Sequence, residues 1–323
     1  MKSTEEKHIS VLYEELVSAI EIFTNRQNII VDCTLWMWGH GKGIIEKMNL
    51  WDVFIWFDAD SKNLVLASER LKKIDDTKII NNLSEVCLDK KNIILINSNF
   101  VNLKQELENR WIKEITGIYY DLWISSVHID EAERWFSFRF DWPLDMRFDT
   151  SQGITAKQVV NSYKKEKLYE IFRNYGEEPA SKKISEAIYR QRRNKKIETT
   201  KDLLEIIEEN SKHPKVKTRI FQAIRIEVNK ELENMEISFK NAIELLIKDW
   251  IIFVISFHSL EDRITKQIFK KETKDCICTD IICTCKHSKT LKLLTKKPIL
   301  PTNTEIQYNP RARSAKARIA KKL

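Results

Sequence analysis

Short β-branched runs alternate with stretches of helical spacing along the first 121 residues of the chain. Consecutive apolar residues predict strands, and apolar residues that recur every three or four positions predict the helices between them. The expected strands are residues 29–32, 53–55, 93–96 and 115–121, and the expected helices are residues 11–23, 44–48 and 64–71. Strands that alternate with helices are typical of an α/β fold, in which helices cover both faces of a parallel sheet.

The pattern changes from about residue 130 onward. Residues 130–230 have helical spacing, many basic side chains and no convincing strand signal. The strand pattern returns with five β-prone residues in succession at 251–255, the strongest β signal in the chain. The sequence therefore predicts a sheet domain in residues 1–129, a helical insert in 130–230, and the second part of the sheet domain, with a basic C-terminal tail, in 231–323.

Composition and charge narrow the function classes. The chain has 323 residues, 42% of them hydrophobic and 32% charged, which is typical of a folded globular protein. It has no apolar run long enough to cross a membrane, and its first ten residues do not resemble a signal peptide, so a cytoplasmic protein without a membrane partner is expected. The net charge of +8 favours a polyanionic partner only weakly, because basic runs are also typical of solvated helix faces and frayed tails. These runs lie at residues 182–196, 212–219 and 311–322.

Three aspartates end predicted strands. Asp32, Asp58 and Asp121 follow the first, second and fourth strands, and open parallel sheets bind ligands at that edge. A carboxylate in the position of Asp58 can accept hydrogen bonds from a ribose, in NAD enzymes as in S-adenosylmethionine enzymes. The NAD alternative requires G-x-G-x-x-G after the first strand, whereas residues 35–41 read LWMWGHG. Each aspartate taken singly could also be a helix cap, but three on one edge predict a site.

Segments along nearly the whole chain resemble the bacterial 16S ribosomal RNA cytosine-N4 methyltransferases. The matching segments, in order, are HISVL (8–12), VDCTL (31–35) with Gly39 and His40, FDAD (57–60), YDL (120–122) with Ser125 and Ser126, DEAER (130–134), FSFRFD (136–141), PLDMR (143–147), YGEE (175–178), TRIFQA (218–223), RI (225–226), VN (228–229), ISFHSLEDR (255–263) and NPRARS (309–314). A match of this extent is far more specific than one short motif.

The resemblance implies a Rossmann-like S-adenosylmethionine methyltransferase sheet with an inserted helical substrate-recognition domain. It implies S-adenosylmethionine as cofactor, and as substrate a cytosine in the decoding region of 16S rRNA, either as RNA or in the small ribosomal subunit. A noncatalytic RNA-binding factor for ribosome assembly is the alternative, and a small-molecule methyltransferase is disfavoured by the basic insert. The oligomeric state stays open, with a homodimer among the alternatives.

The same resemblance implies residue roles. The cofactor contacts carried over are Trp38, Gly39, His40, Asp58, Phe100, Asp121 and His128, although the family usually has glutamine at the last position. Asp121 is the expected acceptor for the target amine, and Ser125 and Ser126 are expected to shape the pocket with it. Expected RNA contacts are Arg139, Arg147, Arg219 and Arg225, for each of which a structural ion pair is the alternative. His258 is left open between a catalytic and a loop-stabilising role.

Glycine is scarce and tryptophan abundant, with 6 glycines and 9 tryptophans. Tryptophan stands where the family has glycine at Trp36, Trp38, Trp56, Trp123, Trp135, Trp142 and Trp250, and at the turn-like positions Trp51 and Trp111. A cofactor loop needs positive φ and close backbone approach, which tryptophan does not provide. Two hypotheses follow. In the favoured one, the cell reads UGA codons as glycine, whereas the printed sequence translates them as tryptophan. In the other, the chain is a decayed, inactive paralogue.

Four cysteines lie close together near the C-terminus. Cys276, Cys278, Cys283 and Cys285 form C-x-C-x4-C-x-C, with His287 nearby. Structural zinc sites usually contain C-x2-C pairs, so the spacing favours reduced surface thiols over zinc. The expected chemistry needs no metal.

Overall fold

The computed structural model describes residues 10–35, 39–122, 141–278 and 284–323. The chain divides into two compact units. The sheet unit comprises Met1–Trp123 and Asn234–Leu323, and the helical unit comprises Ile124–Glu233. Among the described residues, no helix is both long enough and apolar enough to cross a bilayer.

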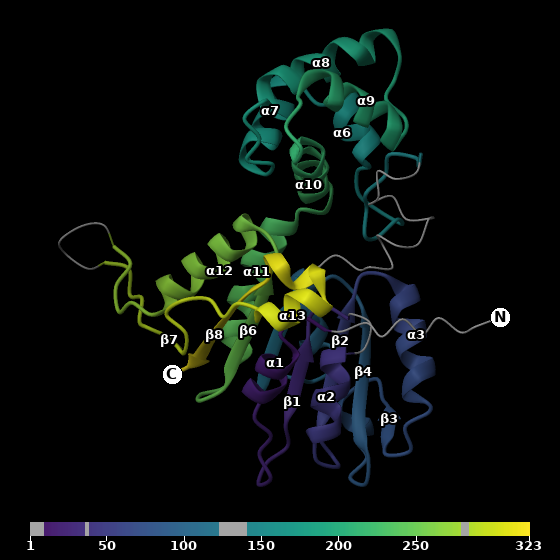
Figure 1. The fold of residues 1–323 in the computed structure, drawn as a ribbon. Coiled ribbons are helices and arrows are strands. Elements are labelled where there is room, and N and C mark those ends of the chain that lie inside the picture. Colours follow the sequence, from purple (N-terminus) through teal and green to yellow (C-terminus); the bar gives the residue numbers. More distant parts are fainter. Residues whose placement is uncertain (1–9, 36–38, 123–140, 279–283) are drawn as a thin grey trace. The chain divides into compact units, whose positions relative to one another are not determined.

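The sheet unit is built on eight strands in the order β3-β4-β2-β1-β5-β6-β8-β7 (Figure 1). The strands are β1 (Ile29–Asp32), β2 (Val53–Asp58), β3 (Thr77–Ile79), β4 (Lys91–Asn97), β5 (Gly117–Asp121), β6 (Ile251–Ser256), β7 (Leu291–Leu293) and β8 (Lys316–Lys322). The first six strands in this order, from β3 through β1 to β6, are parallel to one another. Strand β8 runs antiparallel to both of its neighbours, β6 and β7. The strand order reverses at β1, which lies between β2 and β5, and such a switch point is where open α/β sheets bind ligands.

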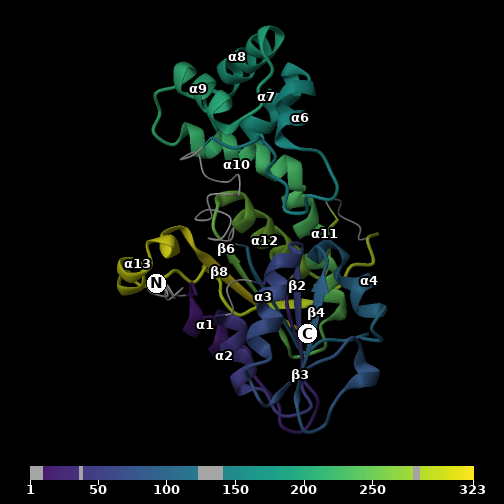
Figure 2. The same cartoon turned by 90° about the vertical axis from the view of Figure 1, so that its right-hand side faces the viewer.

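Helices cover both faces of this sheet (Figure 2). The helices of the unit are α1 (Tyr13–Ala19), α2 (Gly39–Lys47), α3 (Ser61–Leu71), α4 (Leu103–Glu108), α11 (Glu231–Leu245, whose first three residues belong to the helical unit), α12 (Ser259–Glu272) and α13 (Asn303–Tyr308). Helices α1, α2 and α3 share one core cluster with Ile30, Phe54 and Phe253. Helix α11 covers the opposite face, where Phe239 packs edge-on against Tyr120 of β5 with ring centroids 4.8 Å apart. Burial on both faces explains why the central strands are almost continuously apolar.

The helical unit has its own core. Its helices are α6 (Ala156–Ser162), α7 (Lys165–Asn174), α8 (Ser181–Asn194), α9 (Thr200–Asn210) and α10 (Val216–Asn229). Capping boxes begin α6 at Thr155 and α9 at Thr199, which satisfies amide groups that would otherwise lack partners. The apolar faces of the five helices pack together around a core that includes Phe172, Ile188 and Ile220. Within the described part of this unit there is no strand, only an isolated bridge between Pro143 and Thr199, in agreement with the helical insert predicted from the sequence.

Two expectations about the sheet were wrong. The basic segment near the C-terminus is not a tail: it forms β8, inserted between β6 and β7, with Ala317 and Ala320 fully buried. Arg318 is accommodated there because its Nε donates to Asp262 Oδ1 at 2.7 Å. The sheet is therefore mixed rather than parallel throughout. The three-residue strands β3 and β7 were not expected, because they are too short and polar to give a strand pattern.

Helix α2 begins earlier than expected, at Gly39 rather than near Ile44. Three glycines lie within it, although glycine is a poor helix former. Close packing explains them: a Cβ added at Gly41 would lie 2.2 Å from the Trp56 ring, and one at Gly43 would lie 2.2 Å from the Tyr13 hydroxyl.

Candidate active site at the carboxyl ends of the parallel strands

The three aspartates predicted from the sequence lie at one edge of the sheet. Asp32, Asp58 and Asp121 end the adjacent strands β1, β2 and β5. Strand β1 pairs with both of the others, so the carboxylates lie on both sides of the switch point.

Asp32 is a buried anchor of this edge. It is 3% exposed and accepts hydrogen bonds from Tyr119 Oη at 2.6 Å and Trp56 Nε1 at 2.7 Å. It also accepts from the Thr34 amide at 2.9 Å. Burial raises the pKa of Asp32 to about 7, although these donors act in the opposite direction. With its oxygens engaged by protein donors, Asp32 holds the loop after β1 in place, a role that sequence reasoning did not assign.

Asp58 offers a carboxylate beside two amide side chains. Its oxygens accept from the Asp60 amide at 2.7 Å and from Asn63 Nδ2 at 2.9 Å, and Asn97 Nδ2 donates to its carbonyl at 3.0 Å. Removal from water raises the pKa of Asp58 to about 7. The group is half-buried rather than enclosed, so its oxygens can accept hydrogen bonds from a ligand at the strand end.

His40 and Asp121 lie together across α2 and β5. The Nδ1 atom of His40 is 3.5 Å from Asp121 Oδ2, and both side chains are less than a tenth exposed. The other ring nitrogen, Nε2, is 2.9 Å from the Val11 carbonyl, and since a carbonyl only accepts, Nε2 carries a proton. A second proton on Nδ1 would make the contact with Asp121 an ion pair. The Asp121 amide donates to Thr34 Oγ1 at 2.8 Å, which ties this strand end to the loop after β1.

Phe100 lies on the other side of β5. It opens the short 3-10 helix η2 (Phe100–Asn102), which Asn99 caps through its side chain. Its ring packs edge-on against Tyr120 at 5.7 Å between centroids and is half-buried. An aromatic face is therefore present near the strand ends.

The remaining predicted residues divide into two groups. Trp38, Ser125, Ser126, His128 and Arg139 lie outside the described residues, as do Trp36, Trp123, Trp135 and Cys283. The three other arginines each form an ion pair within the helical unit, which is the alternative to an RNA contact that the sequence left open. Arg147 pairs with Asp145 at 2.7 Å, Arg219 with Glu178 at 3.3 Å and Arg225 with Glu231 at 2.7 Å.

His258 caps α12. The Glu261 amide donates to His258 Nδ1 at 3.4 Å, and the His258 amide donates to Glu261 Oε2 at 3.1 Å, which forms a capping box. Of the two roles left open by the sequence, the structure shows the loop-stabilising one. The sequence signal was present in the H-S-L-E spacing, a variant of the usual capping-box pattern.

Four of the five described tryptophans fall into two kinds, and the fifth, Trp142, is half-buried without a left-handed φ. Trp51 and Trp111 have φ angles of 75° and 63°, in the left-handed region that favours glycine. Trp56 and Trp250 have buried indoles, the latter packed 4.5 Å from the Phe23 ring. Only Trp51 and Trp111 have a backbone conformation that favours glycine.

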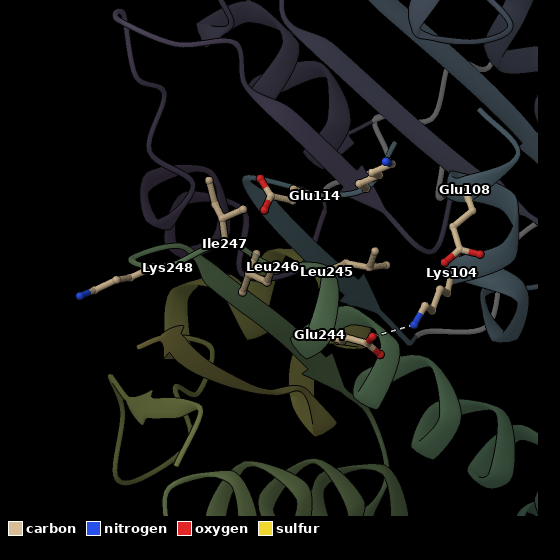
Figure 3. A pocket seen from close by; sticks show the side chains of 9 residues that line it. Lys104, Glu108, Glu114, Glu244, Leu245, Leu246, Ile247 and Lys248 are labelled. Carbon is tan, nitrogen blue, oxygen red and sulfur yellow. Dashed lines mark hydrogen bonds and ion pairs between the residues drawn. The ribbon is translucent and has the colours of Figure 1, made fainter. Parts of the chain in front are cut away.

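A charged hollow of about 350 Å³ lies elsewhere in the sheet unit (Figure 3). Lys104 and Glu244 form an ion pair of 2.6 Å at its wall. Its other lining residues include Glu114 and Ile247, which lie in the short segments that lead into β5 and β6. The hollow is thus at the amino ends of these strands, away from the three aspartates, and is not part of the candidate site.

Six parallel strands with carboxylates on both sides of their switch point define the sheet unit as a Rossmann-like nucleotide-binding fold. The model of the MraW methylase family matches residues 5–323. The chain belongs to this family of methylases, and the expected fold class is confirmed.

Relatives match over almost the full length. The ribosomal RNA small subunit methyltransferase H of Clostridium botulinum (strain Loch Maree / Type A3) is 41% identical over 326 residues, which cover 98% of this chain and 99% of the relative. The proteins of that name from Caldicellulosiruptor saccharolyticus and Clostridioides difficile are 42% and 39% identical, each with coverage of 98% and 99%. The family resemblance seen in the sequence segments is confirmed.

Proposed function

We propose that this protein is an S-adenosylmethionine-dependent methyltransferase that methylates the exocyclic N4 amine of a cytosine in the decoding region of 16S rRNA. Full-length identity of 41% to a ribosomal RNA small subunit methyltransferase H carries the proposal. The small ribosomal subunit, a cytoplasmic location and the absence of a membrane partner are parts of the same proposal.

The residues at the strand ends fit this cofactor. The half-buried carboxylate of Asp58, at the end of the second strand, suits the two hydroxyls of a ribose. The half-buried ring of Phe100 suits the face of an adenine. Asp32 accepts hydrogen bonds from Tyr119 Oη and the Thr34 amide, one on each carboxylate oxygen, so it serves the fold rather than the ligand. In this assignment Gly39 and His40, at the start of α2, border the methionine end.

The chemical task is to make a poor nucleophile react. The lone pair of a cytosine N4 amine is delocalised into the ring, and S-adenosylmethionine supplies an electrophilic methyl group when bound. Asp121 accepts a hydrogen bond from the amine, which turns the nitrogen toward the methyl group, and orientation of this kind can supply much of the rate. His40 holds the Asp121 carboxylate at 3.5 Å and so acts as a positioning residue. The target base has to leave its stack to reach the strand ends.

The helical unit is proposed to bind the RNA backbone. Helix α8 exposes Lys182, Lys183, Arg190 and Arg193, while its other face is buried in the unit's core. Lysine and arginine side chains in such an array neutralise phosphates without reading sequence. Among the three predicted arginines that the structure describes, Arg219 keeps the most exposed side chain, 32%, against 18% for Arg147 and 7% for Arg225.

We further propose that the native protein carries glycine at the nine tryptophan positions. The φ angles of Trp51 and Trp111 support this. Peptide mass mapping of the protein from its native cells tests it directly. Glycine masses at residues 36, 38, 51 and 111 are expected, and tryptophan masses would contradict the proposal.

The function is tested with recombinant protein that has glycine at all nine positions. Radiolabelled S-adenosylmethionine is supplied with either naked 16S rRNA or small subunits, and the product nucleoside is identified by mass spectrometry. We expect N4-methylcytidine. Cofactor binding without any transfer to either RNA substrate would refute the proposed reaction, and absence of cofactor binding would instead favour the noncatalytic RNA-binding factor.

A further inference from the structure

Three cysteines converge in the segment between α12 and β7. The Sγ atoms of Cys276, Cys278 and Cys285 all lie within 4.8 Å of one another. The separation of Cys276 Sγ from Cys285 Sγ is 3.8 Å, although the two residues are nine positions apart in the chain. The segment therefore folds back on itself and brings its thiols together.

Apolar packing does not explain this fold-back. None of the described residues in 271–278 and 284–290 is buried. Polar contacts close the base of the segment: the Thr290 amide donates to the Glu272 carbonyl at 2.8 Å, and Thr290 Oγ1 donates to Glu272 Oε2 at 2.7 Å. Small structures that cannot build a core commonly depend on a disulfide or a metal.

Backbone amides point at two of the sulfurs. The Cys278 amide donates to Cys276 Sγ at 3.4 Å, and the Thr284 amide donates to Cys278 Sγ at 3.3 Å. Hydrogen bonds of this kind stabilise negative charge on sulfur, which is the form that binds metals. Basic side chains that flank the thiols in sequence, Lys274 and Lys286 among them, act in the same direction.

We propose that Cys276, Cys278 and Cys285 bind a structural zinc ion. Tetrahedral zinc with Zn–S bonds of about 2.3 Å places its sulfurs about 3.8 Å apart, which is the separation of Cys276 and Cys285. A disulfide would need about 2.05 Å. The fourth position is taken by water or a further side chain. On binding, the thiols release their protons to solvent, and the binding free energy orders the segment. The structure thus favours the zinc alternative over the reduced surface thiols expected from the spacing.

The test is metal content with matched cysteine variants. The protein is purified under reducing conditions, supplied with zinc, desalted and measured by inductively coupled plasma mass spectrometry. We expect one zinc ion per chain, lost in Cys276→Ser and in Cys285→Ser. The Cys87→Ser variant is the control, because Cys87 is a half-buried cysteine outside this cluster, and it should retain the metal.

A second measurement does not depend on methyl transfer. Trypsin should cut after Lys274 or Lys286 faster once zinc is removed by a chelator, and added zinc should restore protection in the parent chain but not in Cys276→Ser. Zinc-free protein after zinc supply would overturn the proposal. So would a disulfide between Cys276 and Cys285 in the protein isolated from cells with its thiols alkylated at lysis.

Discussion

Trp111 occupies the position after α4 at which helices commonly carry glycine. Its amide donates to the Glu108 carbonyl at 3.0 Å, and the next amide, of Ile112, donates to the Leu107 carbonyl at 2.9 Å. This pair of bonds is a Schellman motif, in which the first residue beyond the helix cap adopts the left-handed conformation. Leu107 and Ile112 are both fully buried, as the hydrophobic contact of that motif requires. The φ of 63° at Trp111 follows from this geometry.

The perturbation is a pair of substitutions, Trp111→Gly and Trp111→Ala. Both remove the indole, which is 65% exposed, so their difference isolates the effect of a Cβ at positive φ. A left-handed non-glycine residue costs about 1–2 kcal/mol, and the extra freedom of glycine in the unfolded chain offsets about 0.5–1 kcal/mol of this. We expect the glycine variant to be more stable than the alanine variant by about 1 kcal/mol.

The assay is urea unfolding followed by far-ultraviolet circular dichroism, because fluorescence would change with the tryptophan itself. Gln105, an exposed residue inside α4, provides the control pair. There alanine should be more stable than glycine by about 1 kcal/mol, the opposite order. An alanine variant at residue 111 as stable as the glycine variant would refute the argument from the backbone.

Three other predictions concern the site and the helical unit. Because the pKa of Asp58 is raised to about 7, its ionised fraction grows as pH rises through neutrality. The affinity for S-adenosylmethionine, measured by calorimetry, should therefore increase from about pH 6 to about pH 8. An unchanged pH dependence in Asp58→Asn would exclude this carboxylate as the cause. Asp121→Ala removes the acceptor that orients the amine and should lower kcat for methyl transfer by about a hundredfold while the Kd for cofactor stays nearly constant, and equal loss of both would point to a binding role. Replacing Lys183, Arg190 and Arg193 by glutamine should weaken RNA binding and reduce the slope of log K against log salt by about 0.7 for each lost phosphate contact; a slope equal to that of the parent chain would remove α8 from the RNA-binding surface.

Local pattern was enough to predict the central strands and the helical insert. Strands such as β6 are buried on both faces, so the run of residues 251–255 carries the strand signal by itself. The aspartates could be placed at one edge for a related reason: each directly ends such a run, and parallel strands direct their carboxyl ends to the same side. The family resemblance added the cofactor and the substrate, which no local pattern indicates.

Tertiary contacts decided the features that local pattern left open or predicted wrongly. Helix α2 contains glycines that intrinsic helix propensity disfavours, and Gly43 lies where a Cβ would meet the Tyr13 hydroxyl. From its basic sequence, β8 was predicted to be a tail, and it can be a strand of the sheet because Asp262 pairs with Arg318. The raised pKa of Asp32 likewise depends on burial by residues distant in the chain. Charge burial and the distances between ligand atoms are properties of the folded chain, whereas strand and helix patterns are properties of neighbours in sequence.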